Sequence, residues 1–124
     1  MKKEIATDNA PKAIGPYSQG ILWNDLIFAS GQIPVNPANG EIPASIKEQT
    51  KQVLENVSAI LKSSGSSIEN VIKTTVFIKN MNDFAEMNAV YETYFIKPFP
   101  ARSTVEVARL PKDVLVEIEV IAYK

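Results

Sequence analysis

The sequence contains neither cysteine nor histidine. Without cysteine the chain has no disulfides, no thiolate nucleophile and no cysteine metal site. Without histidine, acid–base chemistry near neutral pH must use carboxylates, tyrosine, lysine, water or the substrate itself. Because transition-metal sites also lose their usual nitrogen and sulfur ligands, we expect neither a metal site nor a metal-dependent reaction.

An excess of charge of either sign is also missing. Lysine and arginine total 13, aspartate and glutamate total 14, and the pI is about 5.5. Such a chain has no positive field to attract a phosphate backbone, which argues against a nucleic-acid partner. The first residues, MKKEIATDNAP, are charged and lack the apolar stretch of a signal peptide or membrane span, so we expect a cytoplasmic protein.

What is present is typical of one globular domain covering residues 1–124. The composition is 45% hydrophobic and 22% charged, which is ordinary for such a domain. A chain of this length buries a real core but is short for closing a deep cleft by itself. A site between subunits is therefore one expectation.

Hydrophobic periodicity and turn residues predict the order β-β-α-β-α-β-β. The predicted strands are Gln19–Trp23, Leu26–Ile33, Val71–Lys79, Arg102–Val107 and Val114–Tyr123, with a further short strand near Lys3–Ala6; the predicted helices run from a Ser45–Glu48 capping box to about Ser64 and from Asn80 or Asn82 to about Phe95. Each helix follows strands, and the simplest packing places both helices on one face of a mixed sheet. The fold class is thus α+β.

The last predicted strand has two different faces. Its alternation places Val116, Ile118 and Val120 on a core face, whereas Glu117 and Glu119 share the other face with three apolar side chains, those of Leu115, Ile121 and Tyr123. A face exposed to solvent would be uniformly polar. We therefore predict that copies of the protein cover this second face, as a closed cyclic oligomer.

Arg102 and Glu117 are the candidate catalytic residues. If the last two strands form an antiparallel hairpin through a turn at 108–113, Arg102 lies opposite or diagonal to Glu117 on one face. A guanidinium and a carboxylate on a half-buried surface suit a small anionic substrate and an oriented water. The alternative is an ion pair that joins two surfaces and has no chemical role.

Three further residues carry two interpretations each. Tyr17, within GPYSQG, is either an anchoring aromatic or a ring aimed at a neighbour. Gly31 permits either a β-bulge or close approach of the backbone to a ligand. Asn88 is an amide in the apolar stripe of the second helix, and it either bonds a strand end or loop or lines a pocket.

Four stretches match a pattern known from other proteins: AIGPYSQG at 13–20, FASGQIP at 28–34, FAEMNAVYETYF at 84–95 and ARSTVEVARLPKDVLVEIE at 101–119. Through them the chain resembles, over nearly its whole length, the Rid/YjgF family of reactive-intermediate imine deaminases. The resemblance implies a chorismate-mutase-like fold and a homotrimer with its sheets facing inward and three sites between subunits. It also implies cofactor-free hydrolysis of 2-iminobutanoate, 2-iminopropanoate or their 2-aminoacrylate-type enamines to 2-keto acids and ammonia.

The same resemblance assigns roles to single residues. It implies that Arg102 grips the substrate carboxylate, that Glu117 holds the attacking water, and that Tyr17, Gly31 and Asn88 line the pocket. Many members have a cysteine where this chain has Thr104, which offers a hydroxyl but no thiol. Beside Arg102, Glu117 is expected to stay ionised.

Two other functions compete with the deaminase. One is a module that binds 2-keto or amino acids without turnover, as a sensor or regulator. The second charge at Glu117 argues against it, because pure carboxylate binding needs no second anion. The other is a ribonuclease or translation inhibitor, against which the acidic pI, the missing histidine and the lack of a basic aromatic strip all count.

Overall fold

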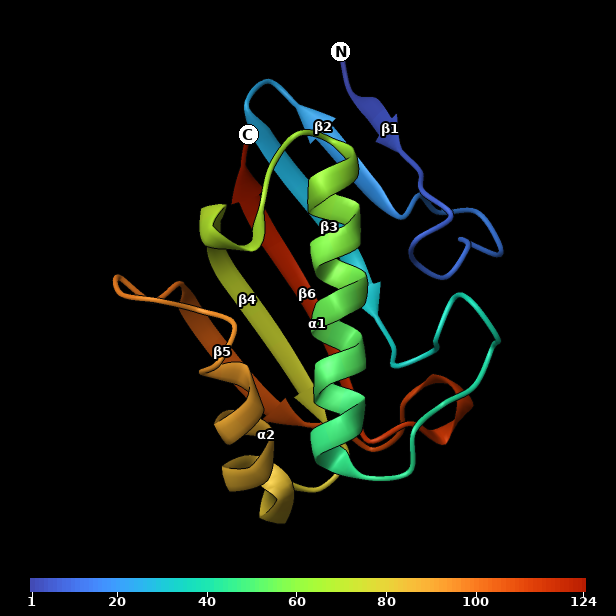
Figure 1. The fold of residues 1–124 in the computed structure, drawn as a ribbon, viewed down its shortest axis with the longest axis vertical. Helices are drawn as coiled ribbons and strands as arrows, with labels where there is room; N and C mark the ends of the chain where they lie inside the picture. Colours follow the sequence, from blue (N-terminus) through green and yellow to red (C-terminus); the bar gives the residue numbers. More distant parts are fainter.

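The computed structural model describes all residues from Met1 to Lys124. One six-stranded mixed sheet lies behind two helices, and the strand order is β1-β2-β3-β6-β4-β5 (Figure 1). The strands are β1 (Lys3–Ile5), β2 (Gly20–Trp23), β3 (Leu26–Gln32), β4 (Val71–Ile78), β5 (Ala101–Glu106) and β6 (Val116–Tyr123); the helices are α1 (Ile46–Ser63) and α2 (Phe84–Tyr91), with 3-10 turns η1 (Ile68–Asn70), η2 (Met81–Asp83) and η3 (Pro111–Asp113).

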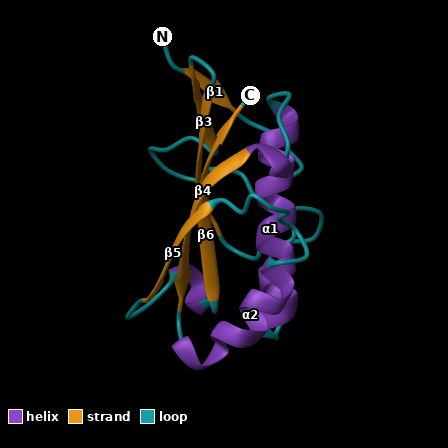
Figure 2. Cartoon of the chain, turned by 90° about the vertical axis from the view of Figure 1, so that its left-hand side faces the viewer, coloured by secondary structure: helices purple, strands orange, loops and turns teal.

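The predicted α+β class is confirmed. Both helices cover the same face of the sheet, and the other face carries no helix (Figure 2). The one strand beyond the predicted order is the short β1, which the sequence placed near Lys3–Ala6. None of the helices is long and apolar enough to cross a membrane.

The core lies between α1 and the sheet. The apolar stripe of α1 is fully buried: Val53, Leu54, Val57, Ile60 and Leu61. The strands meet it with alternate side chains, including Ile118 and Ala122 of β6 at 0% exposure. Each large apolar side chain buried in this way contributes roughly 1.5–3 kcal/mol before entropy is counted, so this layer holds the fold together.

The predicted capping box forms at the start of α1, and a glycine follows the end of the helix. The Ser45 hydroxyl accepts a hydrogen bond from the Glu48 backbone N–H (3.1 Å) and donates to the Glu48 carboxylate. At the other end Gly65 adopts φ +82°, and the Ser66 N–H donates to the Leu61 carbonyl. This is a Schellman termination, which the left-handed conformation of glycine permits at no steric cost.

β2 and β3 form a hairpin, and β4 lies inside the sheet, between β6 and β5. Trp23 pairs with Leu26 across a two-residue turn in which Asn24 has φ 55°. The second helix is shorter than predicted, because it ends at Tyr91 and the chain turns back there. The Tyr91 and Phe95 rings then stack with centroids 4.5 Å apart.

The predicted hairpin between the last two strands is wrong. β5 pairs in parallel with β4, and β6 pairs antiparallel with the other side of β4, so β4 separates them. The nine residues from 107 to 115 cross the end of β4 through η3. Consecutive strands are neighbours in only about two thirds of cases, and a connection of this length spans one intervening strand easily.

We predict that Ser45→Ala lowers the free energy of unfolding by about 1 kcal/mol, because α1 loses its N-cap. Urea denaturation checks this. Ser58→Ala, in the middle of the same helix, is the matched control and should be neutral or slightly stabilising because alanine has the higher helix propensity. Equal midpoints for the two variants would contradict the capping role.

Candidate active site

Arg102 projects from β5 toward α2. Its Cα pairs with that of Thr74 on β4, whose hydroxyl shares a 2.7 Å hydrogen bond with the Tyr91 hydroxyl of α2. Paired residues of neighbouring strands point to the same face. Arg102 therefore lies on the face of the sheet that the helices cover.

The guanidinium of Arg102 is held by neutral groups. Its Nη1 donates to Asn88 Oδ1 at 2.6 Å, and its Cζ lies 4.7 Å from the centre of the Tyr91 ring and 5.3 Å from that of Phe84. Phe84, Asn88 and Tyr91 are spaced three and four residues apart, so one face of α2 presents all three. The amide of Asn88 thus finds its partner in the candidate site and not at a strand end or loop.

No carboxylate of the chain neutralises Arg102. The one ion pair in the chain joins Arg109 to Asp113, at 3.1 Å on the surface. Beside Arg102 lies a cavity of about 390 Å³, lined also by Asn88, Tyr91, Glu92, Phe99 and Pro100. A fixed guanidinium with its charge unpaired, facing a cavity, suits an anionic ligand.

Thr104 lies two residues after Arg102 on the same strand face. Its Cα pairs with that of Val76, which is fully buried. The Thr104 hydroxyl is itself buried and has no hydrogen-bond partner in the chain. Because an unsatisfied buried hydroxyl is costly, a ligand or water that bonds it would recover that free energy.

Glu117 lies on the opposite face of the sheet. Its Cα pairs with that of Phe77 on β4, three residues beyond Thr74, and successive side chains of a strand alternate between faces. The expectation that Arg102 and Glu117 meet on one face of a single chain is therefore wrong. That expectation came from the predicted hairpin, because only direct pairing of β5 with β6 would place Arg102 beside Glu117 on one face.

Glu117 packs against Gly31. A Cβ on Gly31 would lie 2.9 Å from Cδ and 3.1 Å from Cγ of Glu117, which is far too close for a side chain. Gly31 falls where the register of β3 against β6 shifts, between Ala29 and Gln32. The predicted bulge is present, and the missing side chain makes room for a carboxylate.

Burial raises the pKa of the half-buried Glu117 carboxyl, and repulsion from the nearby Glu119 raises it further. Arg102 does not offset this within one chain, because it lies on the other face. The expectation that Arg102 keeps Glu117 ionised is therefore wrong for the single chain.

Tyr17 belongs to the loop between β1 and β2. The carbonyl of the next residue, Ser18, accepts a hydrogen bond from the Ser30 hydroxyl, so this loop lies beside the strand segment that carries Gly31. The Tyr17 side chain is 53% exposed, so it does not anchor the core. The predicted residues thus form two groups on one chain, Arg102 with Asn88 and Thr104 and Glu117 with Gly31, and the loop that carries Tyr17 borders the second group.

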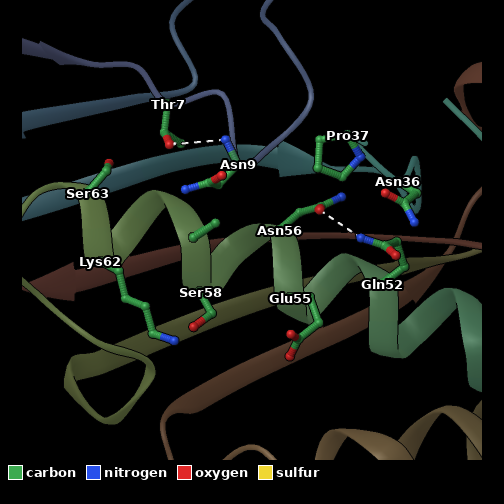
Figure 3. Close-up of a pocket in the computed structure, with 11 residues that line it drawn as sticks. Thr7, Asn9, Asn36, Pro37, Gln52, Glu55, Asn56, Ser58, Lys62 and Ser63 are labelled. Atoms are coloured by element: carbon green, nitrogen blue, oxygen red, sulfur yellow. Dashed lines mark hydrogen bonds between the residues drawn. The ribbon is translucent and has the colours of Figure 1, made fainter. Parts of the chain in front are cut away.

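A wider polar groove of about 570 Å³ runs along α1 and holds none of the predicted residues (Figure 3). Many of its polar groups bond protein atoms. Asn56 Nδ2 donates to the carbonyls of Ile33 and Val35, and its Oδ1 accepts from Gln52 at 2.9 Å. These bonds hold a loop onto α1, and the groove has no unpaired buried charge for a ligand.

Two contributors were missed by sequence reasoning. Within the second helix the sequence predicts only Asn88 as a site residue, whereas Tyr91 and Phe84 also flank the guanidinium. Their spacing around Asn88 was the available signal. Glu119 was noted as a face partner of Glu117, but its effect on the Glu117 pKa needed the burial seen in the structure.

We predict that Gly31→Ala lowers the pKa of Glu117 toward the ordinary range of a glutamate. The new methyl group displaces the carboxylate, and a carboxylate moved toward solvent loses the desolvation that raised its pKa. NMR titration of the Glu117 Cδ resonance measures this. Gly40→Ala, whose Cβ would have no neighbour within 4 Å, is the control, and an unchanged Glu117 pKa in Gly31→Ala would contradict the contact.

Known proteins resemble this chain throughout. The sequence model of the family described as Endoribonuclease L-PSP matches residues 7–124. RutC family protein PH0854 of Pyrococcus horikoshii is 60% identical over 125 residues, covering 100% of this chain and 99% of the relative. The 2-iminobutanoate/2-iminopropanoate deaminase of Escherichia coli K12 is 56% identical over 127 residues, with coverage of 100% and 99%.

A solved structure agrees in fold as well as sequence. The crystal structure of Escherichia coli TdcF with bound serine superimposes with a TM-score of 0.94 at 50% identity, covering 98% of each chain. The two chains therefore share one fold over almost their whole length. The chain therefore belongs to the family described as Endoribonuclease L-PSP, which is the Rid/YjgF family.

Proposed function

We propose that the protein is an imine deaminase that hydrolyses 2-iminobutanoate, 2-iminopropanoate and related enamine tautomers to 2-keto acids and ammonia. The observation that carries this proposal is the Arg102 guanidinium, fixed by Asn88 and two aromatic faces yet left without an anionic partner beside a cavity. A guanidinium that is held in place and has no anionic partner can bind a small carboxylate.

The names of the relatives support the same chemistry. The Escherichia coli relative at 56% identity is named for this activity, and the TdcF structure contains serine, whose α-carboxylate is the group that a guanidinium binds. Both proteins align with this chain over almost its whole length. A shared site is the simplest explanation of the identity.

Arg102 binds and orients the substrate in this proposal. Its remaining N–H groups form a planar fork for the substrate carboxylate, while Asn88 holds the other side of the guanidinium. The unpartnered Thr104 hydroxyl lies on the same strand face and donates to the substrate or to the attacking water. In this proposal Tyr17 and Gly31 line the rest of the substrate pocket.

The reaction needs one water and no cofactor. The water oxygen bonds to C2 of the protonated imine while Glu117 accepts a proton from it, which gives a carbinolamine. Glu117 returns the proton to the nitrogen and then accepts the hydroxyl proton as the C–N bond breaks. The C2 carbonyl forms, and the departing ammonia takes up that proton as ammonium. Because a protonated imine is already electrophilic, positioning and proton transfer suffice.

The environment of Glu117 suits this proton transfer. A general base is most efficient when its pKa lies near the working pH, and burial with the nearby Glu119 raises the pKa of Glu117 in that direction. An ordinary solvated glutamate would be a weaker base. An arginine from another copy of the chain would lower the pKa of Glu117 and so keep its carboxylate ionised.

The site is completed by a second copy of the chain. Arg102 and Glu117 occupy opposite faces of one sheet, so they meet only if β5 of one copy lies against the face of another that carries no helix. That face exposes apolar side chains, including Trp23, Phe28 and Tyr123 at 41–50% exposure. We assign a homotrimer with three sites between subunits, in keeping with the family resemblance.

A module that binds 2-keto or amino acids without turnover is the second candidate. It uses the same unpaired Arg102, so binding alone does not separate the two. The half-buried Glu117, whose pKa burial raises, favours catalysis. The ribonuclease of the family description is the weaker candidate, since the chain has no histidine and a net charge of −1.

We predict that Arg102→Ala lowers the rate of imine hydrolysis by roughly 100-fold or more, because substrate positioning is lost. Arg102→Lys should remain at least about tenfold impaired, since lysine keeps the charge but not the fork. The assay generates the imine in situ with a dehydratase and follows keto-acid release, with oligomer mass checked in parallel. Activity of Arg102→Ala within a few-fold of wild type would refute the carboxylate clamp.

Mixed oligomers test the shared site. Arg102→Ala and Glu117→Ala are each expected to be inactive, yet their co-expression should restore about a quarter of wild-type activity, because that fraction of interfaces joins an intact Arg102 to an intact Glu117. Co-expression of Arg102→Ala with the Arg102→Ala/Glu117→Ala double variant is the control and should restore nothing. Failure of the first mixture to regain activity would place both residues in one chain.

A further inference from the structure

The Tyr91 ring lies directly beneath the guanidinium that the proposed function uses. The distance from Arg102 Cζ to the ring centre is 4.7 Å, shorter than the 5.3 Å to Phe84. Tyr91 is only 5% exposed. Cation–π attraction is strongest where water is excluded, so this buried face is the better of the two platforms.

Two contacts hold the Tyr91 ring in place, one at its hydroxyl and one with a neighbouring ring. Its hydroxyl shares a 2.7 Å hydrogen bond with Thr74, which is fully buried on the central strand β4, and the Phe95 ring stacks on it at 4.5 Å. Burial raises the pKa of the hydroxyl, although the bond to Thr74 and the charge of Arg102 lower it. The hydroxyl therefore stays protonated and cannot neutralise Arg102.

We propose that Tyr91 is a positioning residue that aims Arg102 at the substrate carboxylate through the face of its ring. This inference rests on the proposed role of Arg102 as the carboxylate-binding group. The ring supplies attraction without negative charge, so it restricts the guanidinium and leaves its charge for the ligand. A carboxylate at this position would hold the arginine equally well but would compete with the substrate.

The expected signature lies in substrate affinity. Without the ring face, Arg102 can sample other rotamers. The conformational entropy lost when the substrate orders Arg102 then makes the free energy of substrate binding less favourable. Tyr91→Leu should raise KM and weaken binding of 2-ketobutanoate by roughly tenfold, with kcat changed about twofold or less. Tyr91→Phe keeps the ring and should retain affinity within about threefold, although it loses the bond to Thr74.

Tyr94→Leu is the matched control. Tyr94 lies three residues further on, donates its hydroxyl to Glu55 of α1 at 2.8 Å and does not face Arg102. It should lose thermal stability as Tyr91→Leu does, without any change in KM or in keto-acid affinity. A purely structural role of Tyr91 would make the two leucine variants alike, with fewer active molecules and unchanged affinity.

The deciding experiment is calorimetric titration of 2-ketobutanoate into wild type, Tyr91→Leu, Tyr91→Phe, Tyr94→Leu and Arg102→Ala, beside the turnover assay. Weakened binding in Tyr91→Leu and Arg102→Ala alone supports the inference. Equal dissociation constants for wild type and Tyr91→Leu would overturn it, even if turnover is confirmed. Binding without turnover in wild type would contradict the deaminase but still decide the role of Tyr91, and the absence of both binding and turnover in wild type would overturn both.

Discussion

The whole arrangement depends on a sheet that carries helices on only one face. The α1 stripe and the alternate side chains of the strands bury a continuous core on that side. On the other side the same strands expose aromatic and aliphatic side chains together with two carboxylates, Glu117 and Glu119. A surface of this kind is stable in water chiefly when another surface covers it, so the face that carries Glu117 is also the face on which we propose that a second copy packs.

The division of the candidate site follows from this constraint. Arg102 points toward α2, whereas Glu117 points away from it, beside Gly31. Each group is prepared locally: the arginine by Asn88 and aromatic faces, and the glutamate by the space at Gly31. If copies of the chain pack as we propose, an interface brings these groups together, and a short chain without histidine, cysteine or a deep cleft then supports the reaction.

Much of the fold follows from local patterns. Alternation along β6 separated core residues such as Ile118 from Glu117, and the 3.6-residue period of α1 identified its buried stripe. Ser45 and Gly65 marked the ends of that helix through hydrogen bonds made within a few residues. The strength of these predictions has a simple cause, since each depends on interactions between residues close in sequence.

The sequence by itself determined the element types and their core faces, and it singled out Arg102 and Glu117 as candidate site residues, because periodicity, capping and motif spacing are local properties. Only the tertiary structure decided which strands pair. Inserting β4 between β5 and β6 moved Arg102 to one face and left Glu117 on the other. Strand order depends on the packing of α2 and on long-range pairing, which no short stretch of residues encodes.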